Sequence, residues 1–266
     1  MSPSQIPLND PIRNWGPALP EALEAIARAV QSGKWTLGRE TEAFETELAA
    51  YTGVSKAAGV ASGTDALRIA LKCLGCGPGS KVLVAPNAGG YGTSAARSLG
   101  ADVSFADIDP VTHTLSVPGL VHALSTEPVD AVIVTHLFGN VADVDAIMQI
   151  CEPLQIPIVE DCSQATGAYF GESQTHVGSK GSVATLSFYP TKNLGAMGDA
   201  GAILTRSHDL WQKALSLRQY GWSDRYHVTL DGGLNSRLDE VQAAVLRVGM
   251  NHLGFGNAKR RQILLR

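Results

Sequence analysis

Between residues 57 and 161, short apolar runs alternate with longer segments whose apolar residues recur every three or four positions. The runs are rich in β-branched residues, as in KVLVA at 81–85, AVIVTH at 131–136 and IPIVED at 156–161. The segments between them, such as TDALRIALKCL at 64–74, have the spacing of helices that bury one face. Strands that alternate with helices in this way indicate a largely parallel sheet with helices on both faces. The pattern therefore predicts an α/β fold.

Further helices and strands flank this alternation. Residues 18–33 carry Leu19, Leu23, Ile26 and Val30 at helical spacing, which predicts a helix. The other expected elements are helices at 39–51, 91–99, 118–125, 141–151 and 207–221, strands at 57–61, 102–107, 183–189 and 201–205, and a last helix that begins at about 237. No internal repeat interrupts this order, so the elements fit one continuous architecture.

The composition narrows the class of protein. The chain has 266 residues, of which 44% are hydrophobic, and this is enough for one large α/β domain or two small ones. Only 17% of residues are charged and the net charge is −4, which argues against a nucleic-acid binder or a polybasic membrane anchor. No apolar run approaches the roughly 20 residues that span a bilayer. The N-terminus has neither the basic start nor the apolar core of a signal peptide, so we expect a cytoplasmic protein.

The four cysteines fit ordinary buried thiols. Cys73 and Cys76 form a CxxC, but this pair lies where a helix runs into a Gly-Pro turn. A redox pair opens a helix instead, where the dipole lowers the thiol pKa. Cys151 and Cys162 stand alone, and no suitably spaced histidines complete a zinc site. The sequence therefore predicts no metal site.

A phosphate-binding turn is the first candidate for chemistry. Ser62, Gly63 and Thr64 follow the strand at 57–61 and open the next helix. Free amides, a helix dipole and a hydroxyl group suit a phosphate, although the turn taken alone favours an ordinary helix cap at Ser62 or Thr64. The glycines of GCGPGS at 75–80 are not a dinucleotide-binding fingerprint, because they follow a helix and precede a strand.

Polar residues also stand at the carboxyl ends of two predicted strands, where open parallel sheets bind their ligands. Asp161 ends one strand and is either a helix cap for the next segment or a partner for a buried cation. Gln164, three residues later, could point the same way. His136 ends another strand. It is either a ring that contacts a ligand or a core histidine bonded to a backbone carbonyl.

A lysine in a glycine-rich loop adds a third feature. Lys192 lies within SFYPTKNLGAMGDAG at 187–201, which contains too many glycines to form a helix. A single loop lysine is usually only solvated. Combined with a phosphate cradle and an acid at a strand end, it meets the needs of pyridoxal phosphate (PLP). This cofactor has a phosphate to be gripped, a ring nitrogen that must stay protonated, and an aldehyde that condenses with a lysine amine.

Four motifs in one order resemble a known family. They are SGTDALRIALKCLGCGPGSKVLV, VEDCSQATGA, SFYPTKNLGAMGDAGAILT and LNSRLDEVQAAVL. Together they resemble the DegT/DnrJ/StrS sugar-nucleotide aminotransferases, which are fold-type-I PLP enzymes. The likeness extends from about residue 6 to about residue 261. It implies a three-layer α/β/α large domain of the aspartate-aminotransferase type with a mostly parallel sheet.

The same resemblance implies roles for the loop and strand-end residues. Lys192 would form the Schiff base with the cofactor and would move protons between the cofactor and substrate carbons. Asp161 would pair with the pyridine nitrogen, and Gln164 would contact the phenolic oxygen. Lys192 and Asp161 are therefore the expected catalytic residues.

Other residues would hold the cofactor by the same likeness. Gly63, Thr64 and Ser187 would hold its phosphate. Asn235 would reach the phosphate of the neighbouring subunit's cofactor, which implies a homodimer with shared active sites, whereas the residues alone suggest that Asn235 only shapes a turn before a helix. Tyr91 would stack on the cofactor ring, although it stands about two positions later than the family pattern places its aromatic residue.

The resemblance also divides the chain. Residues 1–36 would form an N-terminal arm and helix, and residues 37–237 the PLP-binding large domain. Residues 238–266 would begin the helix that leads to the family's C-terminal small domain, and we expect this chain to lack that domain. A truncated form and a natural short form are both compatible with this pattern.

The expected function is that of a PLP-dependent aminotransferase. It would move an amino group from an amino acid, expected to be glutamate, to a keto group of a nucleotide-linked sugar. One alternative is a catalytically impaired or regulatory PLP-binding protein of the same family. Another is a sugar dehydratase that uses pyridoxamine phosphate, but in that branch the lysine is replaced, so Lys192 argues against it.

Overall fold

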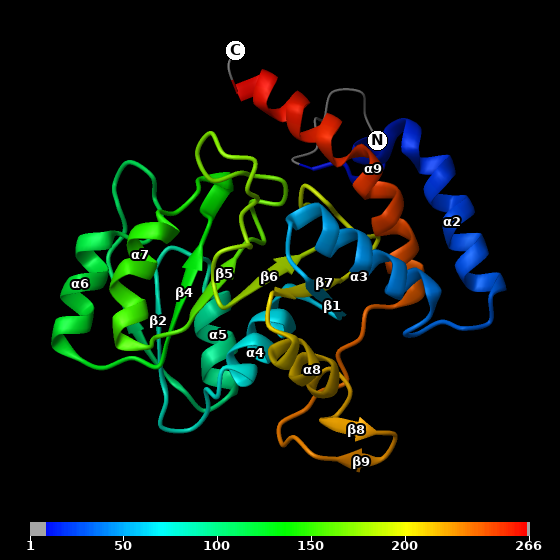
Figure 1. Ribbon diagram of the computed structural model, residues 1–266. Helices are drawn as coiled ribbons and strands as arrows, with labels where there is room; N and C mark the ends of the chain where they lie inside the picture. The colour runs from blue at the N-terminus through cyan, green and yellow to red at the C-terminus, as the bar shows by residue number, and fades with distance from the viewer. Residues whose placement is uncertain (1–8, 265–266) are drawn as a thin grey trace.

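The computed structural model describes residues 9–264. The first residues of the predicted N-terminal arm, 1–8, and the last two residues, 265–266, lie outside this part. A seven-stranded sheet forms the centre of the molecule, with strand order β1-β7-β6-β5-β4-β2-β3 (Figure 1). Its strands are β1 (Lys56–Val60), β2 (Lys81–Val84), β3 (Asp102–Phe105), β4 (Ala131–Thr135), β5 (Ile158–Asp161), β6 (Val183–Ser187) and β7 (Gly201–Thr205).

Most of the sheet is parallel. Only β7 runs against its neighbours, pairing with β1 on one side and with β6 on the other. The remaining neighbours, from β6 to β3, are parallel. Except for the exposed edge strand β3, these strands are buried on both faces, which explains the nearly continuous apolar runs in the sequence. The predicted α/β fold with a mostly parallel sheet is confirmed.

Helices cover both faces of the sheet, as predicted. They are α1 (Pro11–Trp15), α2 (Leu19–Gln31), α3 (Arg39–Thr52), α4 (Gly63–Cys73), α5 (Tyr91–Ser98), α6 (Val117–Thr126), α7 (Val144–Cys151), α8 (His208–Leu217) and α9 (Glu240–Leu264), with short 3₁₀ turns at Gly16–Ala18, Leu137–Gly139 and Glu152–Leu154. One apolar cluster joins the sheet to α3, α6, α7 and α9. A second cluster joins the opposite face to α4, α5 and α8. Figure 1 shows α3 and α4 on opposite sides of the strands.

The predicted N-terminal helix exists as α2, but its large apolar residues do not form its buried face. Leu23 is 54% exposed and Val30 is 50% exposed, whereas Ala22, Ala25 and Ala29 are buried against α9. The small alanine side chains let the two helices approach closely. The larger apolar residues therefore face outward, although their spacing suited a buried stripe.

A two-stranded hairpin was not predicted. It consists of β8 (Trp222–Asp224) and β9 (His227–Val228), which pair in antiparallel fashion. These strands are short and mostly exposed, so they lack the apolar alternation that signals a strand.

In the chain from residue 9 to residue 264, no helix combines the length and the apolar character needed to cross a membrane.

The last helix, α9, is fixed to the start of α3 by a buried carboxylate. The side chain of Glu240 accepts hydrogen bonds from the backbone amides of Gly38, Glu40 and Thr41 and from the Thr41 hydroxyl. Burial alone would raise its pKa, but these donors outweigh that effect and lower it. Glu240 thus supplies the cap that α3 lacks from its own N-cap residue, Gly38.

Candidate active site

Several candidate residues meet at one edge of the sheet because of its strand order. Val60, at the end of β1, and Ser187, at the end of β6, both pair with Gly201 at the start of β7. Asp161, at the end of β5, pairs with Thr185 of the adjacent β6. The turn that opens α4, the loop after β6 and the end of β5 therefore lie side by side, at the edge where open parallel sheets bind ligands.

The start of α4 forms a cradle with Ser187. A Cβ atom on Gly63 would lie 2.5 Å from the Cβ of Ser187 and 3.1 Å from its Oγ, so only a glycine allows this approach. Ser62 is the N-cap and accepts a hydrogen bond from the amide of Asp65 at 3.1 Å. Thr64 is exposed beside it. The helix amides and dipole, with the hydroxyls of Thr64 and Ser187, are suited to an anion.

Asp161 is buried at the edge beside this cradle, with 4% of its surface exposed. Its Oδ1 accepts a hydrogen bond from the amide of Ser163 at 3.1 Å, and its Oδ2 lies 3.5 Å from the hydroxyl of Thr135. Side chains alternate between the faces of a strand, so Asp161 shares the face of Val159, which packs with α4, α5 and α8. Its carboxylate thus lies on the same face of the sheet as the α4 cradle.

Lys192 lies in the loop between β6 and β7. Partial burial lowers the pKa of its amine, because it disfavours the charged form, and the nearby Asp161 carboxylate acts in the opposite direction. Within residues 9–264 the amine takes part in no ion pair. A lysine that is partly desolvated and close to a single carboxylate is available as a nucleophile and as a base.

One buried hydroxyl near Asp161 indicates whether these residues fit a cofactor. Thr185 is fully buried, pairs in register with Asp161, and has no hydrogen-bond partner for its Oγ1 among the described residues. A buried polar atom without a partner is costly, so such atoms commonly mark a place that a ligand or water completes. Thr185 lies on the same face as Asp161 and Ser187, so the residues present fit a polar group held there.

The three other predicted cofactor residues are more loosely placed. Gln164 accepts a hydrogen bond from the amide of Phe138 at 2.9 Å, which leaves its own amide hydrogens pointing elsewhere. Tyr91 opens α5 after β2, two strands away from β5, and is 54% exposed. Asn235 is exposed in the segment before α9. The roles of these residues toward a cofactor stay predictions.

A serine that sequence reasoning missed fixes the segment around Asn235. Ser236 is fully buried, and its hydroxyl accepts a hydrogen bond from the amide of Ala61 and donates one to Asp65 at 2.7 Å. Both partners flank the turn that opens α4. Asn235 is therefore held close to the cradle of its own chain. The motif LNSRLD drew attention to Asn235, but nothing local distinguished Ser236, whose partners lie 171 and 175 residues away.

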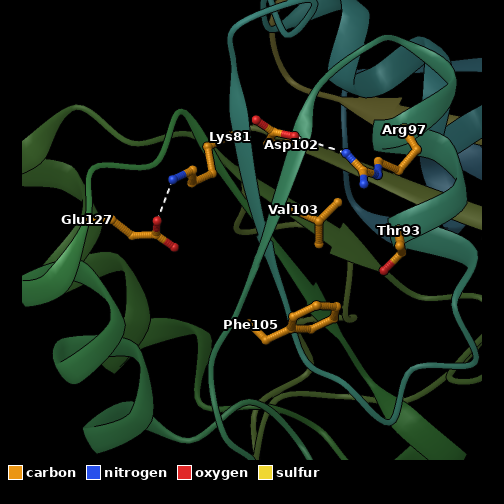
Figure 2. A pocket seen from close by; sticks show the side chains of 7 residues that line it. All are labelled: Lys81, Thr93, Arg97, Asp102, Val103, Phe105 and Glu127. Atoms are coloured by element: carbon orange, nitrogen blue, oxygen red, sulfur yellow. Dashed lines mark hydrogen bonds and ion pairs between the residues drawn. The ribbon is translucent and has the colours of Figure 1, made fainter.

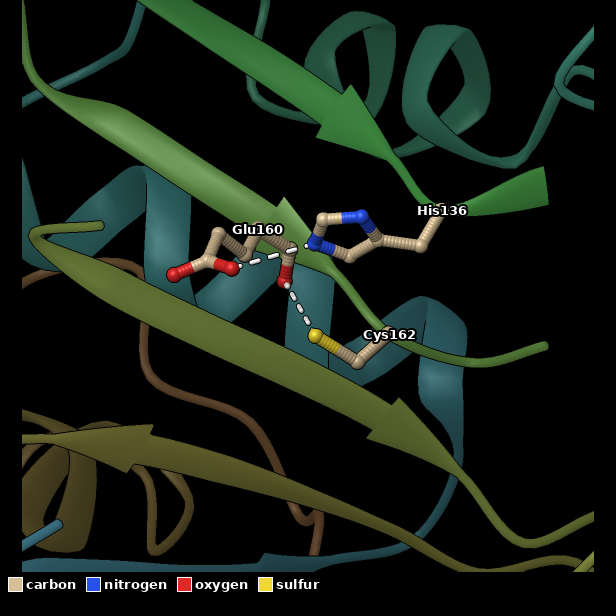
Figure 3. Close-up of side chains that lie close together, drawn as sticks. All are labelled: His136, Glu160 and Cys162. Carbon is tan, nitrogen blue, oxygen red and sulfur yellow. Dashed lines mark hydrogen bonds and ion pairs between the residues drawn. The ribbon is translucent and has the colours of Figure 1, made fainter. Parts of the chain in front are cut away.

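His136 proves to be a core histidine, although its partners differ from the expected carbonyl. Its Nε2 lies 3.0 Å from a carboxylate oxygen of Glu160 (Figure 3). Its Nδ1 accepts a hydrogen bond from the amide of Ala142. The ring is therefore neutral with the proton on Nε2. The amides of Gly178, Lys180 and Gly181 also donate to Glu160.

The side chains of His136 and Glu160 are already hydrogen-bonded to each other and to backbone amides, so they are not free to bind a metal. Atoms of His136, Glu160 and Cys162 lie within 4.8 Å of one another, which is compatible with a metal site on distance alone. Burial would raise the pKa of Glu160, but the histidine and amide donors outweigh burial and lower it. Burial raises the pKa of the Cys162 thiol, so it stays protonated. The cluster anchors β4 and β5 on the face opposite Asp161.

A surface hollow elsewhere carries no comparable chemistry. It has a volume of about 310 Å³ and lies along β3, the edge strand farthest from β1 (Figure 2). Its charged side chains neutralise one another, Lys81 with Glu127 and Arg97 with Asp102. The candidate site is therefore the edge formed by β1, β7, β6 and β5.

Comparison with known proteins agrees with this geometry. The model of the DegT/DnrJ/EryC1/StrS aminotransferase family matches residues 19–266. The chain belongs to this family. The family resemblance inferred from the four motifs is thereby confirmed, and with it the fold-type-I architecture. Aminotransferases of the DegT family use PLP.

Individual members of the DegT family show the extent of the similarity. The chain is 43% identical over 241 residues to dTDP-3-amino-3,4,6-trideoxy-alpha-D-glucose transaminase of Streptomyces venezuelae, covering 89% of this chain and 61% of that protein. The crystal structure of DesV from S. venezuelae has a TM-score of 0.89 and 39% identity, covering 94% of this chain and 66% of DesV. A Bacillus subtilis structure, NtdA with the bound cofactor PMP, has a TM-score of 0.86 and 28% identity, covering 95% and 57%. The chain thus spans about three fifths of the length of these relatives.

Proposed function

We propose that the protein is a PLP-dependent aminotransferase that transfers an amino group from an amino acid to a keto group of a nucleotide-linked sugar. The observation that carries the proposal is the position of the buried Asp161 carboxylate, which lies at the end of β5 on the same face of the sheet as the Gly63–Ser187 cradle. The loop of Lys192 leaves this edge directly after β6, and the Asp161 carboxylate influences the pKa of its amine. An amine, a carboxylate and an anion cradle on one edge match the three chemical groups of PLP.

Each of these residues has a task that follows from its position. The amides at the start of α4, with the hydroxyls of Thr64 and Ser187, would hold the phosphate. The carboxylate of Asp161 would hold a proton on the ring nitrogen by a charge-assisted hydrogen bond. Because Asp161 is buried and already oriented by the Ser163 amide, it loses little freedom when it takes that partner.

The chemistry itself is divided between cofactor and protein. PLP, when bound, supplies an electron sink that stabilises negative charge on a substrate carbon. Lys192 supplies the proton transfers. Its lowered pKa increases the share of neutral amine, and in that form Nζ can accept a proton from the substrate carbon and return it at a second position. Partial burial of the loop keeps bulk water from competing for that proton.

The amino donor is proposed to be glutamate, and the acceptor a nucleotide-linked keto sugar. The S. venezuelae transaminase, whose name describes a dTDP-linked amino sugar, supports this class of substrate. We further propose a homodimer, in which Asn235 contacts the cofactor phosphate of the second subunit. Asn235 is exposed in the segment before α9, which is compatible with contact to a second subunit.

A single-turnover experiment tests the proposal. The chain is loaded with PLP and mixed with glutamate, and both the absorbance of the bound cofactor and the formation of 2-oxoglutarate are followed. We expect one equivalent of 2-oxoglutarate per bound cofactor. Asp161→Asn should slow this step by about 10³-fold, because an amide cannot stabilise the ring proton, on analogy with other substitutions that misplace a catalytic proton.

The surface variant Asp209→Asn is the control, since Asp209 is an exposed acid in the first turn of α8. It should react at the wild-type rate. A chain that binds PLP firmly but yields no 2-oxoglutarate would contradict the proposal and would favour a regulatory PLP-binding protein. A near-normal rate for Asp161→Asn would show that another group holds the ring proton.

A further inference from the structure

The loop that carries Lys192 rests along the last helix, α9. Three contacts join them. Gln242 accepts a hydrogen bond from the amide of Met197 at 2.9 Å and donates one to the Met197 carbonyl at 3.3 Å. Farther along the helix, a Cβ atom on Gly249 would lie 2.9 Å from the Leu194 side chain, so the loop packs directly on the helix there.

The third contact reaches both halves of the proposed active site. Asn257 is buried, and its Oδ1 accepts a hydrogen bond from the side-chain amide of Asn193 at 2.7 Å. Its Nδ2 donates to the carbonyl of Thr166 at 3.0 Å. Asn193 directly follows Lys192, and Thr166 lies in the segment after Asp161. One side chain therefore connects the loop of the lysine to the loop of the carboxylate.

The orientation of this amide is fixed by its partners. The Thr166 carbonyl can only accept, so the NH₂ group of Asn257 must face it and the oxygen must face Asn193. The neighbouring Gly167 has φ +86°, and a Cβ atom there would lie 2.5 Å from Nδ2 of Asn257. A glycine is thus required beside Thr166 both for the backbone conformation and for the space that the amide occupies.

We propose that Asn257 is a positioning residue that fixes the Lys192 loop relative to the Asp161 loop. This inference rests on the proposed function, because the bridge from Asn193 through Asn257 to Thr166 would serve to place the Lys192 amine near the Asp161 carboxylate. Asn257 touches neither reacting group and acts through Asn193 on one side and Thr166 on the other. The bridge spans 64 residues of sequence to one partner and 91 to the other, so it couples segments that no local structure holds together.

The expected consequence of losing the bridge concerns the environment of Lys192. Asn257→Ala leaves the buried carbonyl of Thr166 and the half-buried side-chain amide of Asn193 without this partner, and we expect the loop to gain access to water. Burial is the larger influence on the Lys192 amine and Asp161 the smaller. Greater solvation should therefore raise the pKa of Lys192 toward its ordinary value, even though the influence of Asp161 weakens at the same time.

The test measures this pKa without any cofactor. Lysines of the chain are labelled by reductive methylation with ¹³C-formaldehyde, the Lys192 signal is assigned by its loss in Lys192→Arg, and its titration is followed by NMR. We expect an upward shift of the midpoint in Asn257→Ala. In a second measurement, the dissociation constant for PLP should rise about tenfold, which corresponds to about 1.4 kcal/mol.

The matched control is Asn251→Ala, which replaces an exposed asparagine on the same helix. It should leave the Lys192 midpoint unchanged. If Asn257→Ala does not fold, Asn193→Ala removes the hydrogen bond from the loop side, keeps the bond to Thr166, and should also shift the midpoint upward. Combining Asn193→Ala with Asn257→Ala should add little to Asn257→Ala alone, because that variant already breaks the bridge.

The outcomes separate this inference from the proposed function. An unchanged Lys192 midpoint in the folded Asn257→Ala or Asn193→Ala chain overturns the positioning role, and so does an equal shift in Asn251→Ala. Failure of the wild-type chain to bind PLP contradicts the proposed function but leaves the NMR result standing, because that measurement uses the chain alone.

Discussion

The contact between Gly63 and Ser187 allows a direct test of the proposed phosphate cradle. Adding one methyl group, in Gly63→Ala, places a Cβ atom 2.5 Å from the Cβ of Ser187 and 3.1 Å from its Cα. Ordinary contacts of this kind begin at 3.4 Å. The two groups must therefore separate by about 0.9 Å, the difference between those distances. Rotating the Ser187 side chain cannot relieve the overlap, because the nearest atoms are its Cβ and backbone.

The free energy of this change has two opposing parts. Overpacking of a filled site costs about 1–3 kcal/mol. Replacing a helical glycine by alanine gains up to about 1 kcal/mol, and less at the first position of a helix. The overlap is the larger effect, so we expect Gly63→Ala to lower the free energy of unfolding by about 1–2 kcal/mol. The cradle also opens, and PLP should bind about tenfold more weakly.

Urea denaturation and a PLP titration measure the two effects. Gly77→Ala is the matched control, because no atom lies within 4 Å of a Cβ atom at that position and its backbone is not left-handed. That variant should unfold at a urea concentration equal to or slightly above that of the wild type. If Gly63→Ala unfolds at the wild-type midpoint and binds PLP with unchanged affinity, α4 and Ser187 do not form the tight cradle that we describe.

Two further substitutions test other parts of the structure. Lys192→Ala should abolish covalent fixation of PLP by borohydride, as read by mass spectrometry of the intact chain. Cofactor that is still fixed in this variant would show that another lysine forms the attachment. Glu240→Gln should lower the free energy of unfolding at pH 7 by about 1.5–3 kcal/mol, because four donors on α3 and the preceding turn lose a charged acceptor. The folded-state pKa of Glu240 is lowered, so this stabilisation is complete above the ordinary value of 4.5 and is lost as the pH falls from there through the lowered folded-state pKa. The difference between the urea midpoints of the two chains should therefore be smaller at pH 4 than at pH 7, and a constant difference would contradict the role of the charge.

The sequence was most informative where chemistry and periodicity coincide locally. The turn at Ser62–Thr64, the acid at the end of β5 and the lysine in its glycine-rich loop each stand out by position alone. Strand order then explains why they meet, since β7 lies between β1 and β6 and pairs with the ends of both. Parallel strands brought to one sheet must align their carboxyl ends, so candidates at those ends could be predicted to converge.

Sequence patterns were least informative where long-range contacts decide burial. In α2, the spacing of Leu23 and Val30 predicted a helix but not its buried face, which is formed by the alanines that α9 covers. His136 was left between two interpretations, and only the structure shows its neutral ring held by Glu160 and Ala142. Both outcomes depend on which surface a distant segment covers.

By itself, the sequence determined the α/β class, the family and the residues able to carry out the proposed chemistry, because these depend on local spacing and residue type. Only the tertiary structure decided how those residues are held in place. Ser236 at the cradle and Asn257 between the two loops each bond to groups more than 60 residues away in the sequence. A side-chain amide or hydroxyl has no periodic signature, so its partners are defined only once the chain has folded around it.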